Sequence, residues 1–332
     1  MVHPISLATT YLQTFRIDTE GEHKLRSHAT GFFVRVGGAV LLLTNWHVVS
    51  GLNPSNPSLQ LTQIPSPHYI KVTVSDHKRQ IYELTVPLYD PDMKPRWFEH
   101  PDGHKVDLAI IEFPASAAKH FRFADIFSVE DEEKIDEIVG RDVMVVGYPF
   151  SREELYQGFG EGAAYFLPVW KRGSIASEPT IRLDDRVILI DTLSRPGMSG
   201  APVLMATDSN SYEALSPRTS EVLQRISKGE GSALENLAAL DWSDTKEVKR
   251  KSYRLLGIYS GTIGSTKLAD VALGKCWHLD VIQQAINGAV KGVMEYHTPI
   301  ENIHYTRLLE ELASRTVVKR DAQGNFVDRL KL

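Results

Sequence analysis

The sequence predicts an all-β protein built from two antiparallel β-barrels. Nine short apolar runs, each bounded by turn residues, recur between Thr30 and about Ile263. Runs of this length are typical of strands, and their connection mainly by loops favours antiparallel barrels over a βαβ fold. We expect the first barrel over about 1–125, the second over about 140–275, and the crossing connection at 113–139. The expected strands are Thr30–Val36, Ala39–Thr44, Ile70–Val74, Leu84–Pro87, Leu108–Phe113, Val143–Val146, Arg186–Ile190, Pro202–Met205 and Leu255–Tyr259.

Residues 206–252 interrupt this pattern with a polar segment. Ser232 and Glu235 have the spacing of a helix capping box ahead of Leu237 and Leu240, so we expect a partly helical insertion. Its basic run at 246–251 could contact an anionic partner, but short runs of mixed charge are usually solvated surface.

The C-terminal part predicts two helices. The first lies behind Asp280, a plausible N-cap, and the second begins near Tyr305. We therefore place one domain over 1–290 and a helical tail over 291–332, loose from about Arg320. A protein partner could bind through the 206–252 insertion or through this tail. The apolar residues at helical spacing are Ile282, Ala285, Ile286, Ala289, Val293 and Met294, then Tyr305, Leu308, Leu309 and Leu312.

The composition excludes several classes of protein. The chain has 332 residues, 42% of them hydrophobic, so it can bury a large core. Its net charge of −5, without a dominant charged block, argues against a nucleic-acid partner. The longest apolar runs fall far short of the ~20 residues that a membrane-spanning helix needs, so we expect no membrane partner.

Cysteine use and the N-terminal residues indicate a cytoplasmic protein. Cys276 is the single cysteine and cannot form an internal disulfide, and residues 1–4 lack the pattern of a secretory signal. We expect no metal site, because the His100 to His104 spacing is interrupted by Pro101 and Gly103 and no paired cysteines exist.

The most informative stretch is Arg195–Pro202, which sets Ser199 between two glycines in a strand-like context. Upstream lie His47, at the end of one apolar run, and Asp107, at the start of another. Histidine, aspartate and serine thus follow one another in the order used by chymotrypsin-like hydrolases. An α/β-hydrolase would run Ser, Asp, His and carry a G-x-S-x-G elbow, which Gly197–Ala201 does not match.

These three residue types predict a catalytic triad. A serine hydroxyl is a poor nucleophile until a base removes its proton, and imidazole titrates near physiological pH, so His47 is the expected base for Ser199. Asp107 would fix the histidine tautomer and stabilise the imidazolium that forms. Gly197 permits an unusual backbone conformation, and its N–H, with that of Ser199, would form the oxyanion hole.

Each of these residues alone is common in ordinary turns and strand ends, and only their joint order and context favour catalysis. The other histidines fit the role of base less well. His104 lies in a Pro-Asp-Gly turn, His278 begins a helix, and His23, His28 and His68 lie in polar loops.

The chain resembles the bacterial trypsin-like serine peptidases, close to the Deg-type branch in its catalytic blocks. The resemblance covers about Thr30 to Ile286 and implies two six-stranded β-barrels, a site in the cleft between them and peptide-bond cleavage without a cofactor. It also implies His47 as base, Asp107 as its partner, Ser199 as nucleophile and Gly197 as an oxyanion-hole donor. The matching blocks are Thr44–Val49, Asp107–Ile111, Val143–Phe150, Arg172–Ser177, Ile190–Thr192, Pro196–Pro202 and Gly257–Gly261.

Several positions depart from the family pattern. Met198 stands where digestive relatives have an aspartate that pairs with a freed N-terminus, so activation by N-terminal clipping is not expected. Ala201 replaces a glycine. The base of the substrate pocket falls near Leu193, which predicts an apolar or small residue before the scissile bond. Ser260 could support Asp107 or line the pocket with Gly261, and the sequence leaves both registers open.

We expect no PDZ module after Gly261, because the ~70 residues that follow are predicted to form two helices and a tail and fall below the usual size of a separate domain. We therefore expect a stand-alone cytoplasmic serine endopeptidase that cleaves a protein or peptide substrate through an acyl-enzyme. Two alternatives stay open: a non-hydrolytic binding or scaffold protein that keeps the double barrel, and an esterase that uses the same triad.

Overall fold

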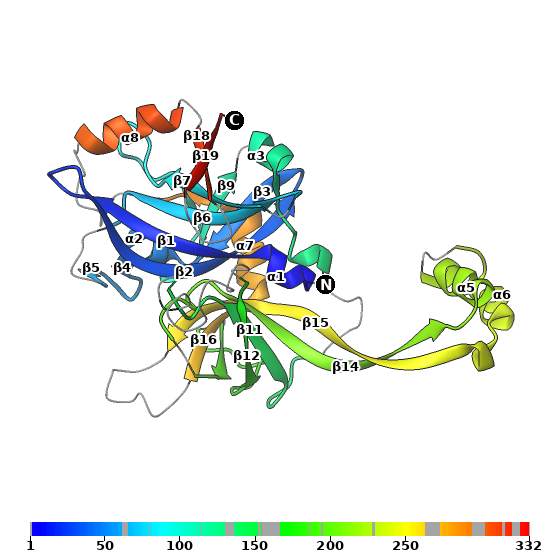
Figure 1. The fold of residues 1–332 in the computed structure, drawn as a ribbon. Helices are drawn as coiled ribbons and strands as arrows, with labels where there is room; N and C mark the ends of the chain where they lie inside the picture. The colour runs from blue at the N-terminus through cyan, green and yellow to red at the C-terminus, as the bar shows by residue number, and fades with distance from the viewer. Residues whose placement is uncertain are drawn as a thin grey trace.

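A computed structural model of the chain shows two β-lobes and a long arm that extends away from the lower lobe (Figure 1). The N-terminal lobe is blue to cyan and the second lobe is green to yellow in that view. The structure describes residues 2–61, 66–78, 80–113, 115–129, 136–151, 154, 167–184, 186–193, 195–227, 230–262, 273–293, 303–313, 316–320 and 326–331.

The first lobe is an eleven-stranded antiparallel sheet with the order β17-β8-β9-β3-β2-β1-β6-β7-β18-β19, and β10 also pairs with β6. Short elements join its strands: α1 (Pro4–Ala8), α2 (Trp46–Ser50), α3 (Ala115–His120), the small hairpin β4 (Leu52–Asn53) and β5 (Asn56–Gln60), and two 3-10 turns at Gly103–Lys105 and Phe127–Val129. The strands are β1 (Thr9–Ile17), β2 (His23–Val36), β3 (Ala39–Thr44), β6 (Tyr69–Asp76), β7 (Ile81–Pro87), β8 (Phe98–Glu99), β9 (Ala109–Phe113), β10 (Phe121–Arg122), β17 (Val290–Lys291), β18 (Thr316–Arg320) and β19 (Phe326–Lys331).

The second lobe is a closed six-stranded barrel with the order β11-β12-β13-β16-β15-β14. Strand β14 pairs with both β15 and β11, which closes the sheet. Helix α7 (Leu279–Gly288) follows its last strand, with His278 as N-cap. The six strands are β11 (Asp142–Gly147), β12 (Val169–Ile175), β13 (Val187–Asp191), β14 (Pro202–Ala214), β15 (Thr245–Thr262) and β16 (Leu273–His278).

Period-two alternation explains why the strands are apolar on both faces. Side chains point alternately to opposite sides of a sheet. On β2, Phe33 enters the core of the first lobe, whereas Phe32 enters the layer shared by both lobes. On β11, Val145 points into the barrel and Val146 into the shared layer. Continuous apolar runs therefore mark strands that are covered on both sides.

The predicted all-β class and one barrel are confirmed, but a second closed barrel is not shown. The two edges of the first sheet carry extra strands from the C-terminal part of the chain. Strand β17 pairs with β8 at one edge and the hairpin β18–β19 pairs with β7 at the other, and among the described residues no strand pairing joins the two edges.

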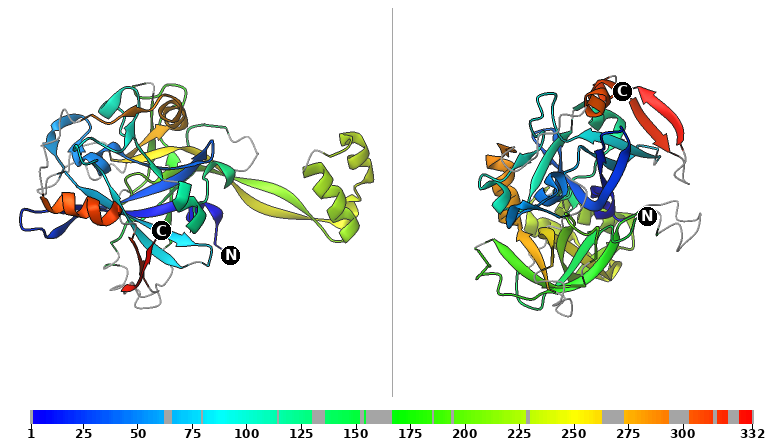
Figure 2. Two further views of the ribbon diagram at one scale, coloured as in Figure 1. Left: turned by 90° about the horizontal axis from the view of Figure 1, so that it is seen from above. Right: turned by 90° about the vertical axis from the view of Figure 1, so that its left-hand side faces the viewer.

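The C-terminal part combines the expected helices with strands that the sequence analysis did not foresee. Helix α8 (Ile303–Ala313) occupies the second predicted helical stretch. Helix α7 occupies only the first part of the other one, because its N-cap is His278, not Asp280, and it ends at Gly288, where β17 follows. The chain beyond Arg320 was expected to be loose, yet β19 pairs with β18 in a hairpin (Figure 2, right). Helix α8 docks through Tyr305, whose hydroxyl donates to Tyr89 O (2.8 Å) and accepts from Tyr89 N (3.0 Å).

The polar segment predicted as an insertion forms the arm. Strands β14 and β15 continue past the barrel as a twisted two-stranded ribbon (Figure 2, left). The ribbon ends in α5 (Pro217–Ser227), α6 (Ala233–Ala239) and a 3-10 turn at Trp242–Asp244. The helices confirm the partly helical prediction, whereas the flanking residues are strand, not loop.

Candidate active site

His47 lies at the start of α2, where the chain leaves β3 of the first lobe. Asn45 is the N-cap residue of this helix, and Gly51 ends it with a left-handed φ of 75°. The Gly51 N–H donates to His47 O at 2.9 Å. Val48 and Val49 are buried in the first-lobe core, which anchors the helix and fixes the position of the imidazole.

Asp107 precedes β9 and is 2% exposed. Its side chain accepts two hydrogen bonds from His47. Asp107 Oδ1 accepts from the His47 backbone N–H at 2.9 Å, and Oδ2 lies 2.7 Å from His47 Nδ1. The Asp107 carbonyl also accepts from Asn45 Nδ2 at 2.8 Å. The Asp107 carboxylate thus binds both the backbone and the ring of His47.

The electrostatics of the pair fix the histidine tautomer. Burial acts to raise the pKa of the Asp107 carboxyl, but His47 and the Ser260 hydroxyl outweigh it, so the pKa falls below its ordinary value. The ionised carboxylate can only accept, so Nδ1 carries the ring proton of a neutral His47. Nε2 is then the unprotonated nitrogen, the form that a general base requires.

Ser260, on β15, donates its hydroxyl to Asp107 Oδ2. Of the two roles that the sequence left open, contact with Asp107 is the one that the structure contains. Gly261 follows with φ 80°, and the space around its Cα is open. Leu193 is 73% exposed. A substrate pocket built from Leu193, Ser260 and Gly261 stays a prediction.

The segment that carries Ser199 is fixed to both lobes. Thr30 N, in the first lobe, donates to Ser199 O at 2.9 Å, and Thr30 Oγ1 donates to Gly197 O at 2.7 Å. On the barrel side, Gly200 N donates to Tyr259 O at 2.9 Å. Tyr259 directly precedes Ser260 on β15. The same strand therefore bonds the backbone next to Ser199 and, through Ser260, the side chain of Asp107.

Two glycines make this segment possible. Gly197 and Gly200 have φ of 91° and 85°, a region that L-residues with side chains rarely adopt. A Cβ at Gly197 would lie 2.2 Å from Tyr148 O, and one at Gly200 would lie 2.1 Å from Thr30 O. Glycine is therefore required at both positions by conformation and by space.

The Gly197 and Ser199 amides are available to a ligand. Neither N–H donates a hydrogen bond to an acceptor in the part of the chain that the structure describes. In contrast, the neighbouring amides of Met198 and Gly200 donate to Arg195 O (3.3 Å) and Tyr259 O (2.9 Å). This alternation leaves the two predicted oxyanion-hole donors uncommitted.

The sequence analysis missed several residues that shape the site. Thr30, in the middle of β2, and Asn45, directly after β3, form hydrogen bonds with the predicted functional residues. Each is a polar residue next to an apolar run, which is the signal that could have identified them. Glu99 is buried and its Oε1 accepts from both Trp46 Nε1 and Trp97 Nε1 at 2.9 Å. No pattern in the sequence marks this partner of Trp46, the neighbour of His47.

Among the residues that the structure describes, no group of three or more His, Cys, Asp or Glu side chains is placed to hold a metal ion. Among the same residues, no helix combines the length and apolar character needed to cross a membrane. Residues 263–272, which follow β15, lie outside the described part of the chain.

Comparisons with known proteins show the family to which the chain belongs. No curated protein sequence matches the chain. Among solved structures it is similar to the crystal structure of Rv3671c from M. tuberculosis H37Rv, a Ser343Ala mutant in an inactive form. That similarity has 16% sequence identity and a TM-score of 0.38, and covers 86% of this chain and 89% of that one. Family profiles match residues 29–210, more than half of the chain, to the trypsin-like peptidase domain. The chain therefore belongs to the trypsin-like peptidase family.

Proposed function

We propose that the protein is a serine endopeptidase that hydrolyses peptide bonds through an acyl-enzyme. Ser199 is the nucleophile, His47 the general base and acid, and Asp107 the carboxylate that orients His47. The Gly197 and Ser199 amides form the oxyanion hole. The substrate is a protein or peptide, and the reaction uses no cofactor. The cytoplasmic location and the lack of a nucleic-acid partner stay predictions.

One observation carries this proposal: Asp107 binds His47 at both the backbone N–H and the ring Nδ1. A buried carboxylate that binds both the backbone N–H and the ring Nδ1 of a histidine leaves Nε2 as the basic ring atom. The bond from Thr30 to Ser199 O and the bond from Gly200 to Tyr259 O support the placement of the nucleophile segment on the same network.

The reaction follows from these roles. Ser199 Oγ attacks the substrate carbonyl carbon while His47 Nε2 accepts the hydroxyl proton. The carbonyl oxygen takes up the negative charge, and each amide donor to it is worth about 3 kcal/mol. His47 then gives the proton to the leaving amine as the C–N bond breaks. A water molecule repeats the sequence, so Ser199 is regenerated and the carboxylic acid leaves.

Met198 supports a form that is active without N-terminal clipping. It is buried among the barrel side chains, close to Gly147, and its thioether cannot form an ion pair with a freed amine. We propose that packing of Met198, and not a new salt bridge, holds the Gly197 peptide in place. The preference for an apolar or small residue before the scissile bond is a further part of the proposal.

A fluorophosphonate probe tests the assignment of the nucleophile. The probe should label the wild type at Ser199, as peptide mapping would show, and should not label Ser199→Ala. Labelling that survives Ser199→Ala would contradict the assignment. Ser199→Ala or His47→Ala should lower turnover by about 10⁶-fold, by analogy with other serine peptidases, while the fold persists.

Cleavage of an unbiased peptide library separates the alternatives. The wild type, but not Ser199→Ala, should cleave peptides and show the side-chain preference directly. Turnover of esters without turnover of peptides with the same acyl group would indicate an esterase. No labelling and no cleavage would favour a binding protein.

A further inference from the structure

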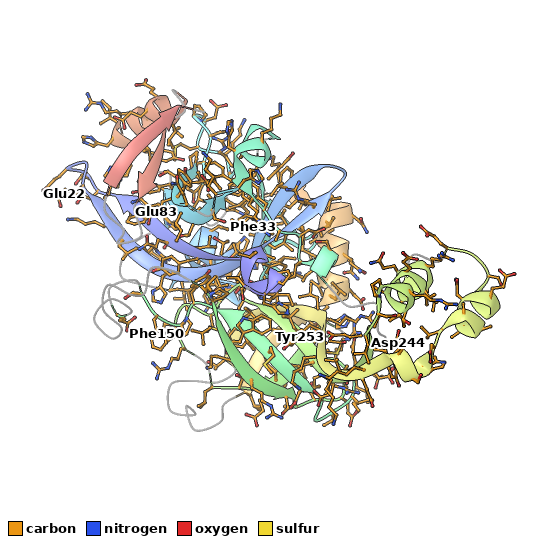
Figure 3. All side chains as sticks on the ribbon, turned by 45° about the vertical axis from the view of Figure 1, so that its right-hand side comes forward. Glu22, Phe33, Glu83, Phe150, Asp244 and Tyr253 are labelled. Carbon is orange, nitrogen blue, oxygen red and sulfur yellow. The ribbon has the colours of Figure 1, made fainter. Side chains whose placement is uncertain are left out.

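The arm is stabilised by little besides its own two strands. Over residues 206–214 and 245–255, β14 and β15 pair with each other, and neither has a second neighbouring strand in the described part of the chain. At a rise of about 3.3 Å per residue, this ribbon is roughly 30 Å long. Figure 3 shows Tyr253 where the arm leaves the body and Asp244 farther along it. An isolated two-stranded ribbon is marginally stable in water, so the arm is a structure that gains from a partner.

The distal end of the arm, which we call the tip (residues 215–244), has few buried side chains among those that the structure describes. They are Thr219, Val222, Asn236 and Leu240. Large apolar side chains are exposed at the same end, including Leu237 at 51% and Trp242 at 53%. Trp242 contacts the exposed Tyr212 edge to face, with ring centroids 5.2 Å apart. Exposed aromatic and apolar residues on a small projecting element are typical of a protein interface.

Charge divides the arm into two parts of opposite sign. The ribbon, which we call the shaft (residues 206–214 and 245–254), has five basic and three acidic residues. The tip has three basic and five acidic residues. The basic run noted in the sequence lies on the shaft, where Lys246, Lys249 and Lys251 are exposed. The acidic side chains of the tip include the exposed Glu221 and Glu235.

We propose that two copies of this chain pair along their arms in antiparallel orientation about a two-fold axis. Such an axis sets the acidic tip of each copy against the basic shaft of the other, so the same complementary contact is made twice. The exposed apolar side chains of the two tips are covered in the same contact. A second copy is the occupant because the arm is complementary to itself.

The size of the arm predicts a reversible dimer. A ribbon roughly 30 Å long and two short helices can each bury one face, which gives roughly 600 Å² per copy. This area lies at the low end for stable complexes and corresponds to a dissociation constant of about 1–100 µM. Because opposite charges contribute, dimerisation should weaken by tenfold or more when salt rises from about 50 to 500 mM.

Sedimentation velocity of the full chain from about 1 to 200 µM tests the proposal. The wild type should shift from the monomer mass of 37.2 kDa to twice that value as its concentration rises. Two charge-reversal variants should each stay monomeric: Lys246→Glu with Lys249→Glu in the shaft, and Glu221→Lys with Glu235→Lys in the tip. Mixing the two variants should restore a dimer, because the acidic shaft and tip of one now face the basic tip and shaft of the other.

Single variants test the apolar part of the contact. Leu237→Asp should raise the dissociation constant at least tenfold. Ile181→Asp is the matched control, since Ile181 is 75% exposed but lies on the body, and this variant should dimerise like the wild type. Recovery of the dimer in the mixture also shows that the charge variants are folded.

Three outcomes would overturn the proposal. The wild type could stay monomeric at 200 µM, or could form a dimer that the charge variants do not change. A monomer whose arm variants raise KM for protein substrates, but not for short peptides, would instead assign the arm to substrate capture. The peptidase assignment does not enter any of the mass measurements, so the two proposals fail separately.

Discussion

Ser260→Ala is the most informative single substitution in the site. It removes a hydroxyl that donates to Asp107 Oδ2 and leaves both contacts from His47 in place. Asp107 is 2% exposed, so water cannot simply replace the lost donor. A hydrogen bond to a charged group contributes about 1.5–3 kcal/mol, and its loss leaves an under-satisfied buried carboxylate. We therefore expect the free energy of unfolding to fall by about 2 kcal/mol near pH 7.

The pH dependence of this loss follows from the pKa of Asp107, which is lowered in the folded protein. A carboxyl whose folded pKa is depressed stabilises the fold above its unfolded pKa of about 4, and this contribution is lost as the pH falls through the folded value. Ser260 supports the charged form. The difference in the free energy of unfolding between the wild type and Ser260→Ala should thus be constant from about pH 5 to 8 and shrink below pH 4.

Urea unfolding at several pH values, followed by fluorescence, measures the effect, and peptide hydrolysis measures its consequence. We expect kcat to fall by about 10-fold to 100-fold, since roughly 1.4 kcal/mol of lost imidazolium stabilisation corresponds to each tenfold. Ser252→Ala is the control, because Ser252 is equally buried on β15 but distant from Asp107 in the strand. A loss below 0.5 kcal/mol, or one that does not change with pH, would refute the reasoning.

The remaining predictions concern the free energy of unfolding, measured with denaturant. Gly200→Ala should lower it by about 3 kcal/mol or more, because the new Cβ would overlap the backbone oxygen of Thr30. Gly140→Ala also has a positive φ, 79°, but no described atom near the new Cβ, so it should lower stability by only about 1 kcal/mol. Equal losses would contradict the steric argument. Tyr305→Phe removes the hydroxyl that bonds both the N–H and the C=O of Tyr89 and should lower the free energy of unfolding by about 1–3 kcal/mol, with faster proteolysis of α8. A loss near zero would count against the docking contact. Burial raises the pKa of Glu99 despite its two indole donors, so ionisation of Glu99 lowers the stability of the fold as the pH rises. Glu99→Gln keeps the acceptor oxygen and should be at least as stable as the wild type at pH 8. A loss of more than 1 kcal/mol in this variant would exclude the explanation.

Local apolar patterning accounts for what the sequence predicts well. Each of the nine expected strands matches an observed strand, although two of them begin one residue early, at Leu108 and Arg186. Residues such as Val145 and Val146 are covered on opposite faces and must both be apolar, which is why the pattern is visible in the sequence. The positions of His47 and Asp107 at strand ends likewise anticipate the hydrogen bonds between them. Spacing and residue type suffice there, since each feature depends on its immediate neighbours.

Long-range pairing was harder to anticipate. Strand β1 escaped detection because polar residues such as Thr10 and Thr14 are buried in it, bonded to Thr73 O (2.6 Å) and Ser27 Oγ (2.8 Å). A buried polar residue whose hydrogen-bond partner lies on another strand cannot be recognised from the residues next to it in the sequence. The same holds for the arm, whose strands are polar because both faces meet solvent, and for the hairpin β18–β19, whose place beside β7 depends on residues more than 200 positions earlier.

The pairing of β18 with β7 has a consequence for folding during synthesis. The N-terminal lobe incorporates Val318 opposite Glu83, so a ribosome must translate some 230 further codons before that partner emerges. The barrel strands and the arm are made in between and can form first. A nascent chain thus carries the β7 edge of the sheet without its β18 partner until the C-terminal residues have been made, and the first lobe is completed only then.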